Sequence, residues 1–229
     1  MSASIPENII KLRNDIAAAE QKYARELNSV QLLAVSKTHS AESIRIAFDS
    51  GLNQFGENYL QEALEKQKQL SDLDIEWHFI GPIQSNKTRS IAEHFSWVHS
   101  IDRLKIALRL GEQRPASLSP LKVLLQVKIG GEESKSGFAI NELSEAAKQI
   151  AAFPNLTLAG LMTIPAPSDN VEKQRENFRL LAEARDSLQK LGYSEFKELY
   201  MGMSQDFEAA IAEGSTLIRI GTGIFGPRS

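Results

Sequence analysis

A lysine placed just after an apolar segment is the residue of this chain best suited to covalent chemistry. Residues 32–35 read Leu-Leu-Ala-Val, a pattern typical of a buried strand, and Lys37 follows two positions later. Burial of the strand would carry this lysine toward a low-dielectric environment, where the pKa of the amine falls. A neutral amine can attack an aldehyde and form a Schiff base. The alternative is an ordinary lysine that reaches from a strand end into water.

Two glycine-containing loops near the end of the chain could bind an anion. Residues 221–226 match G-x-G-x-x-G, but the helix and the acidic residue that a dinucleotide site requires cannot follow in the few remaining positions. The backbone N–H groups of this loop are still open to an anion. The other loop is 202–204, where we expect Ser204 to cap the next helix and to face the same anion. The alternative is two ordinary glycine turns and a helix cap.

Arg219 lies between Ile218 and Ile220 in a predicted strand, so its side chain points away from theirs. If the isoleucines face an outer layer of helices, the guanidinium points toward the interior of the sheet structure. A permanently charged group in that place needs an acceptor. This acceptor is either a ligand or a buried carboxylate.

The composition excludes several classes of function. Among 229 residues there is no cysteine, which excludes disulfides, thiolate zinc sites and thiol catalysis. The net charge of −3 and the absence of Lys/Arg runs do not favour binding to nucleic acid or to a membrane surface. We find neither a signal peptide nor an apolar run long enough to span a bilayer, and we expect a cytoplasmic protein.

Strands and helices alternate along the whole chain. Strands are predicted near residues 32–35, 54–56, 75–80, 97–99, 121–129, 156–162, 199–200 and 216–220. Helices are predicted near residues 9–27, 40–51, 60–68, 85–95, 102–111, 140–152, 171–192 and 205–213. Such alternation requires parallel strands joined by helical crossovers. About eight strands favour a single (β/α)8 TIM-type barrel over residues 1–229, with an open doubly wound sheet as the alternative.

An additional N-terminal helix within residues 1–30 supports closure of the barrel. The nine residues that follow the last strand are too few for a final outer helix, so the N-terminal helix could cover the gap beside that strand. In a barrel, the carboxyl ends of the strands form the active face. The candidates that follow predicted strands, and so share this face, are Lys37, Asn58, His78, Lys135, Met162, Ser204 and Gly221.

Other polar residues suggest no further site. The histidines at 39, 78, 94 and 99 lack zinc-ligand spacing, and we expect no metal centre. The charged residues of segment 62–68 have the pattern of a solvated helix face.

Seven short segments stand out in order along the chain: 33–38 (LAVSKT), 55–59 (FGENY), 77–87 (WHFIGPIQSNK), 134–137 (SKSG), 160–162 (GLM), 202–204 (GMS) and 219–222 (RIGT). With these segments the chain resembles the pyridoxal phosphate homeostasis protein family (YggS/PROSC). The resemblance covers nearly the whole length.

The resemblance implies a barrel like the N-terminal domain of alanine racemase, of PLP fold type III, with pyridoxal 5′-phosphate (PLP) bound to Lys37 as a Schiff base. It implies that Arg219 lies against the pyridine nitrogen. The other cofactor-binding residues that it implies are Asn58, His78, Met162, Met203, Ser204, Gly221 and Thr222. Family members can carry a second lysine where this chain has His39, which leaves Lys135 as the candidate for that role.

The activity that we expect is PLP homeostasis, by supplying or buffering the cofactor, and not robust catalysis. An arginine beside the pyridine nitrogen keeps that nitrogen unprotonated and weakens the ring as an electron sink. A weak racemase of broad specificity is the alternative, and a cofactor-free Schiff-base aldolase is a third interpretation. We expect a monomer whose partners are PLP and, as recipients, PLP-dependent apoenzymes.

Overall fold

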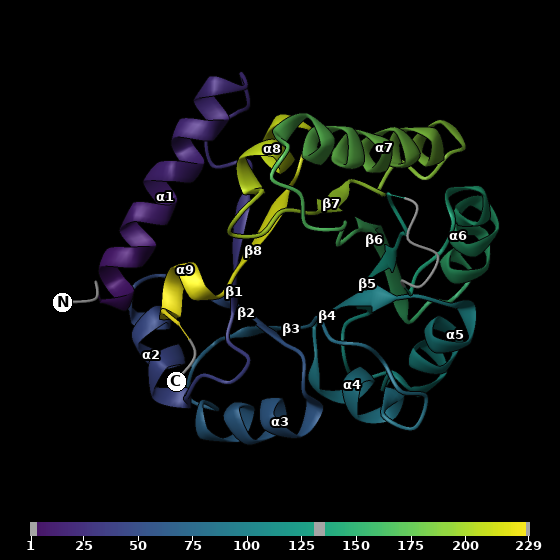
Figure 1. Cartoon of the computed structure of the whole chain (residues 1–229). Coiled ribbons are helices and arrows are strands. Elements are labelled where there is room, and N and C mark those ends of the chain that lie inside the picture. Colours follow the sequence, from purple (N-terminus) through teal and green to yellow (C-terminus); the bar gives the residue numbers. More distant parts are fainter. Residues whose placement is uncertain (1–3, 131–135, 228–229) are drawn as a thin grey trace.

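The computed structural model, which describes residues 4–130 and 136–227, is a closed barrel of eight parallel strands (Figure 1). The strands follow one another around the barrel in chain order, and β1 pairs with β8 to close it. They are β1 (Gln31–Val35), β2 (Gln54–Glu57), β3 (Glu76–Phe79), β4 (Trp97–Ile101), β5 (Leu121–Gln126), β6 (Leu156–Met162), β7 (Glu198–Tyr200) and β8 (Leu217–Ile220). The predicted (β/α)8 barrel is confirmed, and the open sheet is excluded.

Helices surround the barrel on the outside (Figure 1). They are α1 (Ile5–Lys22), α2 (Ala41–Asp49), α3 (Leu60–Gln69), α4 (Thr88–His94), α5 (Leu104–Gln113), α6 (Leu143–Ala151), α7 (Val171–Lys190), α8 (Phe207–Ala212) and α9 (Thr222–Phe225), with a 3₁₀ turn η1 (Ile140–Glu142) before α6. In the described part of the chain, no helix is long and apolar enough to cross a membrane.

Helix α1 occupies the place in the outer ring beside the last strand. It contacts α2, α8 and α9, as Figure 1 shows at the left of the barrel. Its buried face carries Ile9, Leu12 and Ile16 at helical spacing. The helix ends earlier than its apolar pattern predicts, and Leu27 beyond it is 51% exposed. The segment after β8 forms the short helix α9, which the sequence pattern did not predict.

Two apolar clusters explain how the strands are buried on both sides. The larger cluster lies between strands and helices and includes Ile218 and Ile220. The smaller one contains residues of β1 and of β4 to β8, which can meet only inside the barrel. Leu217 belongs to it, so Arg219, two positions along the same strand, also points inward. The predicted direction of Arg219 is therefore confirmed.

Several element ends differ from the sequence pattern because tertiary contacts decide them. Helix α8 begins at Phe207 with Asp206 at its N-cap, so the prediction that Ser204 caps this helix is wrong. The Met203 N–H instead donates to the Asp206 carboxylate, at 2.6 Å, across a turn that precedes the helix. Gly111 does not end α5, which continues to Gln113. The glycine allows close packing instead, because a Cβ atom there would lie only 2.9 Å from the Phe153 ring.

Candidate functional site

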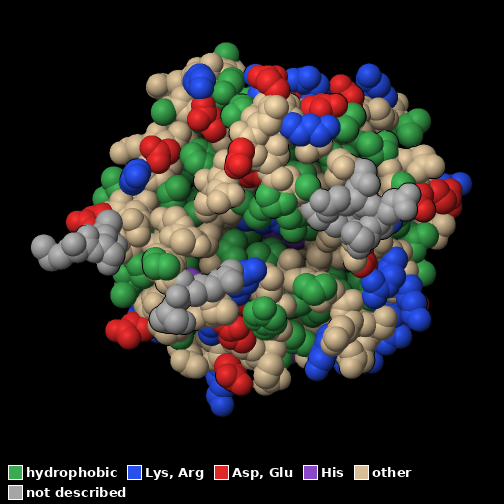
Figure 2. Space-filling model, in the orientation of Figure 1, with side chains coloured by type: hydrophobic (Ala, Val, Ile, Leu, Met, Phe, Trp, Pro, Cys, Tyr) green, Lys and Arg blue, Asp and Glu red, His purple; other side chains and the backbone are tan. Residues whose placement is uncertain are grey.

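A cavity of about 210 Å³ lies at the carboxyl ends of the strands. Figure 2 shows this face of the molecule, with a central hollow where hydrophobic and basic side chains meet. The cavity is lined by Val35, Lys37, His39, Asn58, Ile80, Ile164, Met203, Ser204, Arg219, Gly221 and Thr222. The structure thus brings together every predicted cofactor-binding residue except His78 and Met162.

Lys37 reaches the cavity from the turn after β1. It is half-buried, and Ser36 before it is fully buried. The backbone of Thr38 then takes the left-handed conformation, with φ 68°, which is rare for a β-branched residue. A constrained turn at the end of β1 therefore places the Lys37 side chain at the cavity. The side chain does not simply extend into solvent.

The loops after β7 and β8 supply hydroxyl and backbone groups at one side of the cavity. Ser204 comes from the first loop, and Gly221 and Thr222 come from the second. Gly202 has φ 98°, and a Cβ atom there would lie 2.7 Å from the Cβ atom of Ala210, so the first loop requires glycine at this position. Hydroxyl donors from adjacent loops at strand ends suit a phosphate group.

Arg219 is a buried cation, and one of its N–H groups has no hydrogen-bond partner. It is 5% exposed, and its Nη2 donates to the Thr163 carbonyl oxygen at 3.0 Å. Its Nε is buried without a hydrogen-bond partner, and no carboxylate pairs with it in the described chain. Burial lowers the pKa of Arg219 to about 10, against the attraction of Asp206, so the group remains protonated at neutral pH. A ligand acceptor, such as a ring nitrogen, would satisfy the free N–H.

Asn58 provides a second unsatisfied polar atom, since its Oδ1 is buried without a partner. The residue follows β2, and its backbone is crossed closely by the turn after β3. A Cβ atom at Gly81 would collide with the Asn58 carbonyl oxygen, which explains why the turn after β3 has glycine at this position. Together with Arg219, Asn58 fits a cavity built for a polar ring.

His78 and Met162 lie inside the barrel and do not line the cavity. Both are fully buried, and Nδ1 of His78 is 2.8 Å from Nε2 of His99. Burial lowers the pKa of both histidines, so the pair is neutral at pH 7. Sequence reasoning missed this pairing, although strand alternation places His99 on the same side of β4 as Trp97.

Two more residues bear on the predicted site. His39 stacks on Phe225 of α9, with ring centroids 4.6 Å apart, and so joins the turn after β1 to the turn after β8. The proposed second lysine, Lys135, lies outside the described residues. No group of three or more His, Asp or Glu residues in the described segments could hold a metal ion.

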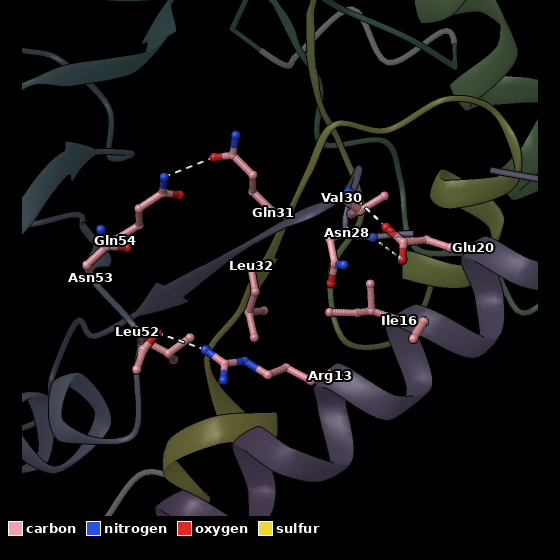
Figure 3. Close-up of a pocket in the computed structure, with 12 residues that line it drawn as sticks. Arg13, Ile16, Glu20, Asn28, Val30, Gln31, Leu32, Leu52, Asn53 and Gln54 are labelled. Carbon is pink, nitrogen blue, oxygen red and sulfur yellow. Dashed lines mark hydrogen bonds between the residues drawn. The ribbon is translucent and has the colours of Figure 1, made fainter. Parts of the chain in front are cut away.

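A second cavity, of about 280 Å³, lies at the opposite end of the barrel between α1 and the starts of β1 and β2 (Figure 3). Its charged side chains already have partners within the protein. Arg13 donates to the Gly51 carbonyl oxygen at 2.8 Å, and the Glu20 carboxylate accepts from the backbone N–H groups of Asn28 and Val30. These interactions connect α1 to the barrel, so we assign this cavity a structural role.

Segment 62–68 departs from the sequence-based interpretation as a solvated surface. Lys66 is only 5% exposed, because its ammonium group binds Glu57 and Glu62 directly beneath the turn that carries Lys37. Helical periodicity alone cannot show which lysine of a charged helix face is buried. Its partner at the end of β2 is known only from the fold.

Comparisons with known proteins show which proteins the chain is similar to. The alanine racemase N-terminal domain family matches residues 9–229. The chain is 55% identical over 226 residues to the pyridoxal phosphate homeostasis protein of Pseudomonas aeruginosa, covering 99% of this chain and 96% of that protein. It is 51% identical over 227 residues to the protein of the same name from Escherichia coli, covering 98% and 97%.

Solved structures show the same fold. PipY of Synechococcus elongatus with PLP bound has a TM-score of 0.85 and 37% identity, covering 97% of this chain and all of that one. Its structure without PLP has a TM-score of 0.87. Alanine racemase from Corynebacterium glutamicum, at 18% identity and a TM-score of 0.71, shares the fold over 61% of its own length.

Proposed function

The chain belongs to the pyridoxal phosphate homeostasis protein family, and from this premise we propose that it binds PLP, holds it as a Schiff base on Lys37, and supplies or buffers it. The observation that carries the proposal is the meeting of Lys37, Arg219 and the loops after β7 and β8 around one cavity. The relatives named as PLP homeostasis proteins and the PLP-bound PipY structure support the choice of ligand.

The residues around the cavity offer two kinds of binding group. Lys37 offers an amine, and Ser204, Gly221 and Thr222 offer hydroxyl and backbone groups. PLP supplies an aldehyde and a doubly charged phosphate to such a pair of sites. The phosphate would accept hydrogen bonds from the hydroxyls, and Lys37 would condense with the aldehyde.

Arg219 favours a carrier over an enzyme. In the proposed orientation its unsatisfied Nε–H would donate to the pyridine nitrogen. A cation beside that nitrogen keeps it unprotonated, which weakens the electron sink on which racemisation depends. Racemisation also needs an acid–base group on each face of the substrate. Apart from Lys37 and Arg219, the only titratable residue among those described at the cavity is His39, which stacks on Phe225.

The carrier role can be tested by cofactor transfer. Protein loaded with PLP is separated from free ligand and mixed with the apo form of a PLP-dependent aminotransferase, whose activity reports transfer. We expect activity to return, and we expect it to be prevented when the loaded protein is first reduced with borohydride, because reduction makes the link permanent. A protein that turns over free amino acids rapidly and never restores the apoenzyme would contradict the carrier role.

A further inference from the structure

A buried ionic cluster of Glu57, Glu62 and Lys66 lies beneath the turn that carries Lys37. Glu57 ends β2, and the other two residues are on α3. The Lys66 ammonium nitrogen is 2.7 Å from Oε1 of Glu57 and 2.5 Å from Oε1 of Glu62. Glu57 is fully buried and Lys66 nearly so. We call this group the Glu57–Glu62–Lys66 cluster.

The cluster fixes the residue before Lys37. The Ser36 hydroxyl donates to Oε1 of Glu57 at 2.7 Å, and the Ser36 carbonyl oxygen accepts from the Lys66 ammonium at 2.8 Å. Ser36 is itself fully buried, so these bonds are shielded from water. Both the side chain and the backbone of this residue are therefore held by charged partners.

The cluster also fixes the residue after Lys37. The Thr38 backbone N–H donates to Oε1 of Glu62 at 2.6 Å. Thr38 has φ 68°, a strained conformation that persists only where surrounding contacts determine it. The bond to Glu62 is such a contact, and it orients the chain on the far side of the lysine.

The charges of the cluster depend on Lys66. Burial raises the pKa of Glu57, while the Lys66 ammonium and the Ser36 hydroxyl oppose this rise. Removing the ammonium would leave a buried carboxylate without its cation, and the carboxylate would then take up a proton or move. The hydrogen bonds to Ser36 and Thr38 would change with it.

We propose that the Glu57–Glu62–Lys66 cluster positions Lys37 and so sets the rate at which it captures PLP, an inference that rests on the proposed function. In capture, the neutral amine nitrogen bonds to the aldehyde carbon, and the aldehyde oxygen leaves as water with the two amine protons. The rate depends on the amine meeting that carbon in the right orientation. The phosphate is held by other loops, so the cluster acts on capture and not on phosphate affinity.

The test compares two variants of the cluster with two matched controls on the same helix. The variants are Glu62→Ala and Lys66→Met, and the controls are Glu65→Ala and Lys68→Met, whose wild-type side chains are exposed. Two quantities are measured for each protein. One is the rate of Schiff-base formation with PLP, followed by stopped-flow absorbance. The other is the affinity for 4′-deoxypyridoxine 5′-phosphate, which has the ring and phosphate but no aldehyde.

We expect capture to slow about tenfold or more in both cluster variants, with analogue affinity within about twofold of wild type and both controls unchanged. An unchanged capture rate in Glu62→Ala overturns the proposal. An equal loss of analogue affinity does so as well, because it indicates a general structural role. If Lys66→Met does not fold, Glu62→Ala decides, since that side chain is 29% exposed. A wild-type protein that forms no Schiff base at Lys37 overturns the proposed function itself.

Discussion

Replacing Arg219 by methionine should leave the ligand-free protein at least as stable as the wild type while it weakens PLP binding. Burial lowers the pKa of Arg219 from its ordinary value to about 10, and at about 1.36 kcal/mol per pH unit the free-energy cost of burying this cation is about 3 kcal/mol. Arg219 is protonated at pH 7 in both the folded and the unfolded state, so the full cost of burial applies at this pH. The Arg219→Met variant avoids this cost, but it also loses the hydrogen bond to the Thr163 carbonyl oxygen, which offsets about 1–3 kcal/mol of the gain in stability.

The net change is a stabilisation of about 0–2 kcal/mol, or a rise of up to about 8 °C in the melting temperature of a chain of this size. Urea unfolding of the ligand-free proteins measures it. Arg114→Met is the matched control, because this buried arginine donates to the carbonyl oxygens of Ala92, Phe95 and Ser119 and should be needed for stability. A ligand-free Arg219→Met protein that loses more than about 2 kcal/mol would refute the reasoning, since Arg219 would then be a structural residue.

Three further outcomes follow from the site and its supports. Ser204→Ala and Thr222→Ala should each weaken PLP binding by about 1.5–3 kcal/mol without unfolding the protein, and unchanged dissociation constants in both would place the phosphate elsewhere. Gly202→Ala should destabilise the protein by about 2–5 kcal/mol in thermal unfolding, whereas Gly192→Ala, with open space around it, should cost only about 1 kcal/mol. The nearby His78 ring, with Lys122 and Trp97, lowers the pKa of Glu76 to about 2, so its contribution to stability is present above pH 4.5 and is lost as the pH falls toward 2. Glu76→Gln should therefore lose stability relative to wild type at pH 6 and much less at pH 3.

Residues whose role depends on strand position could be predicted from the sequence. Alternation in β8 places Arg219 inside the barrel, and the end of an apolar strand places Lys37 at its mouth. The same reasoning places the loops after β7 and β8 beside each other once a barrel is assumed. These predictions succeed because a parallel barrel brings all strand ends to one face.

Residues whose role depends on partners from other elements could not be predicted. Lys66 has the sequence pattern of a surface lysine, and only the approach of β2 to α3 shows that it is buried against Glu57. Ser204 resembles a helix cap, but the chain turns once more and Asp206 takes that place. His78 lies within β3 and not after it, so its side chain points into the barrel and contacts His99 below the cavity. In each case tertiary contact overrides local pattern.

The most direct measurement is the site of covalent PLP attachment. Protein incubated with PLP is reduced with borohydride, digested and mapped by mass spectrometry, with Lys37→Ala and Lys87→Ala treated in the same way. We expect a single modified peptide that contains Lys37 in the wild type and in Lys87→Ala, and no adduct in Lys37→Ala. An adduct at another lysine, or one that survives Lys37→Ala unchanged, would contradict the central claim that the lysine after β1 holds the cofactor.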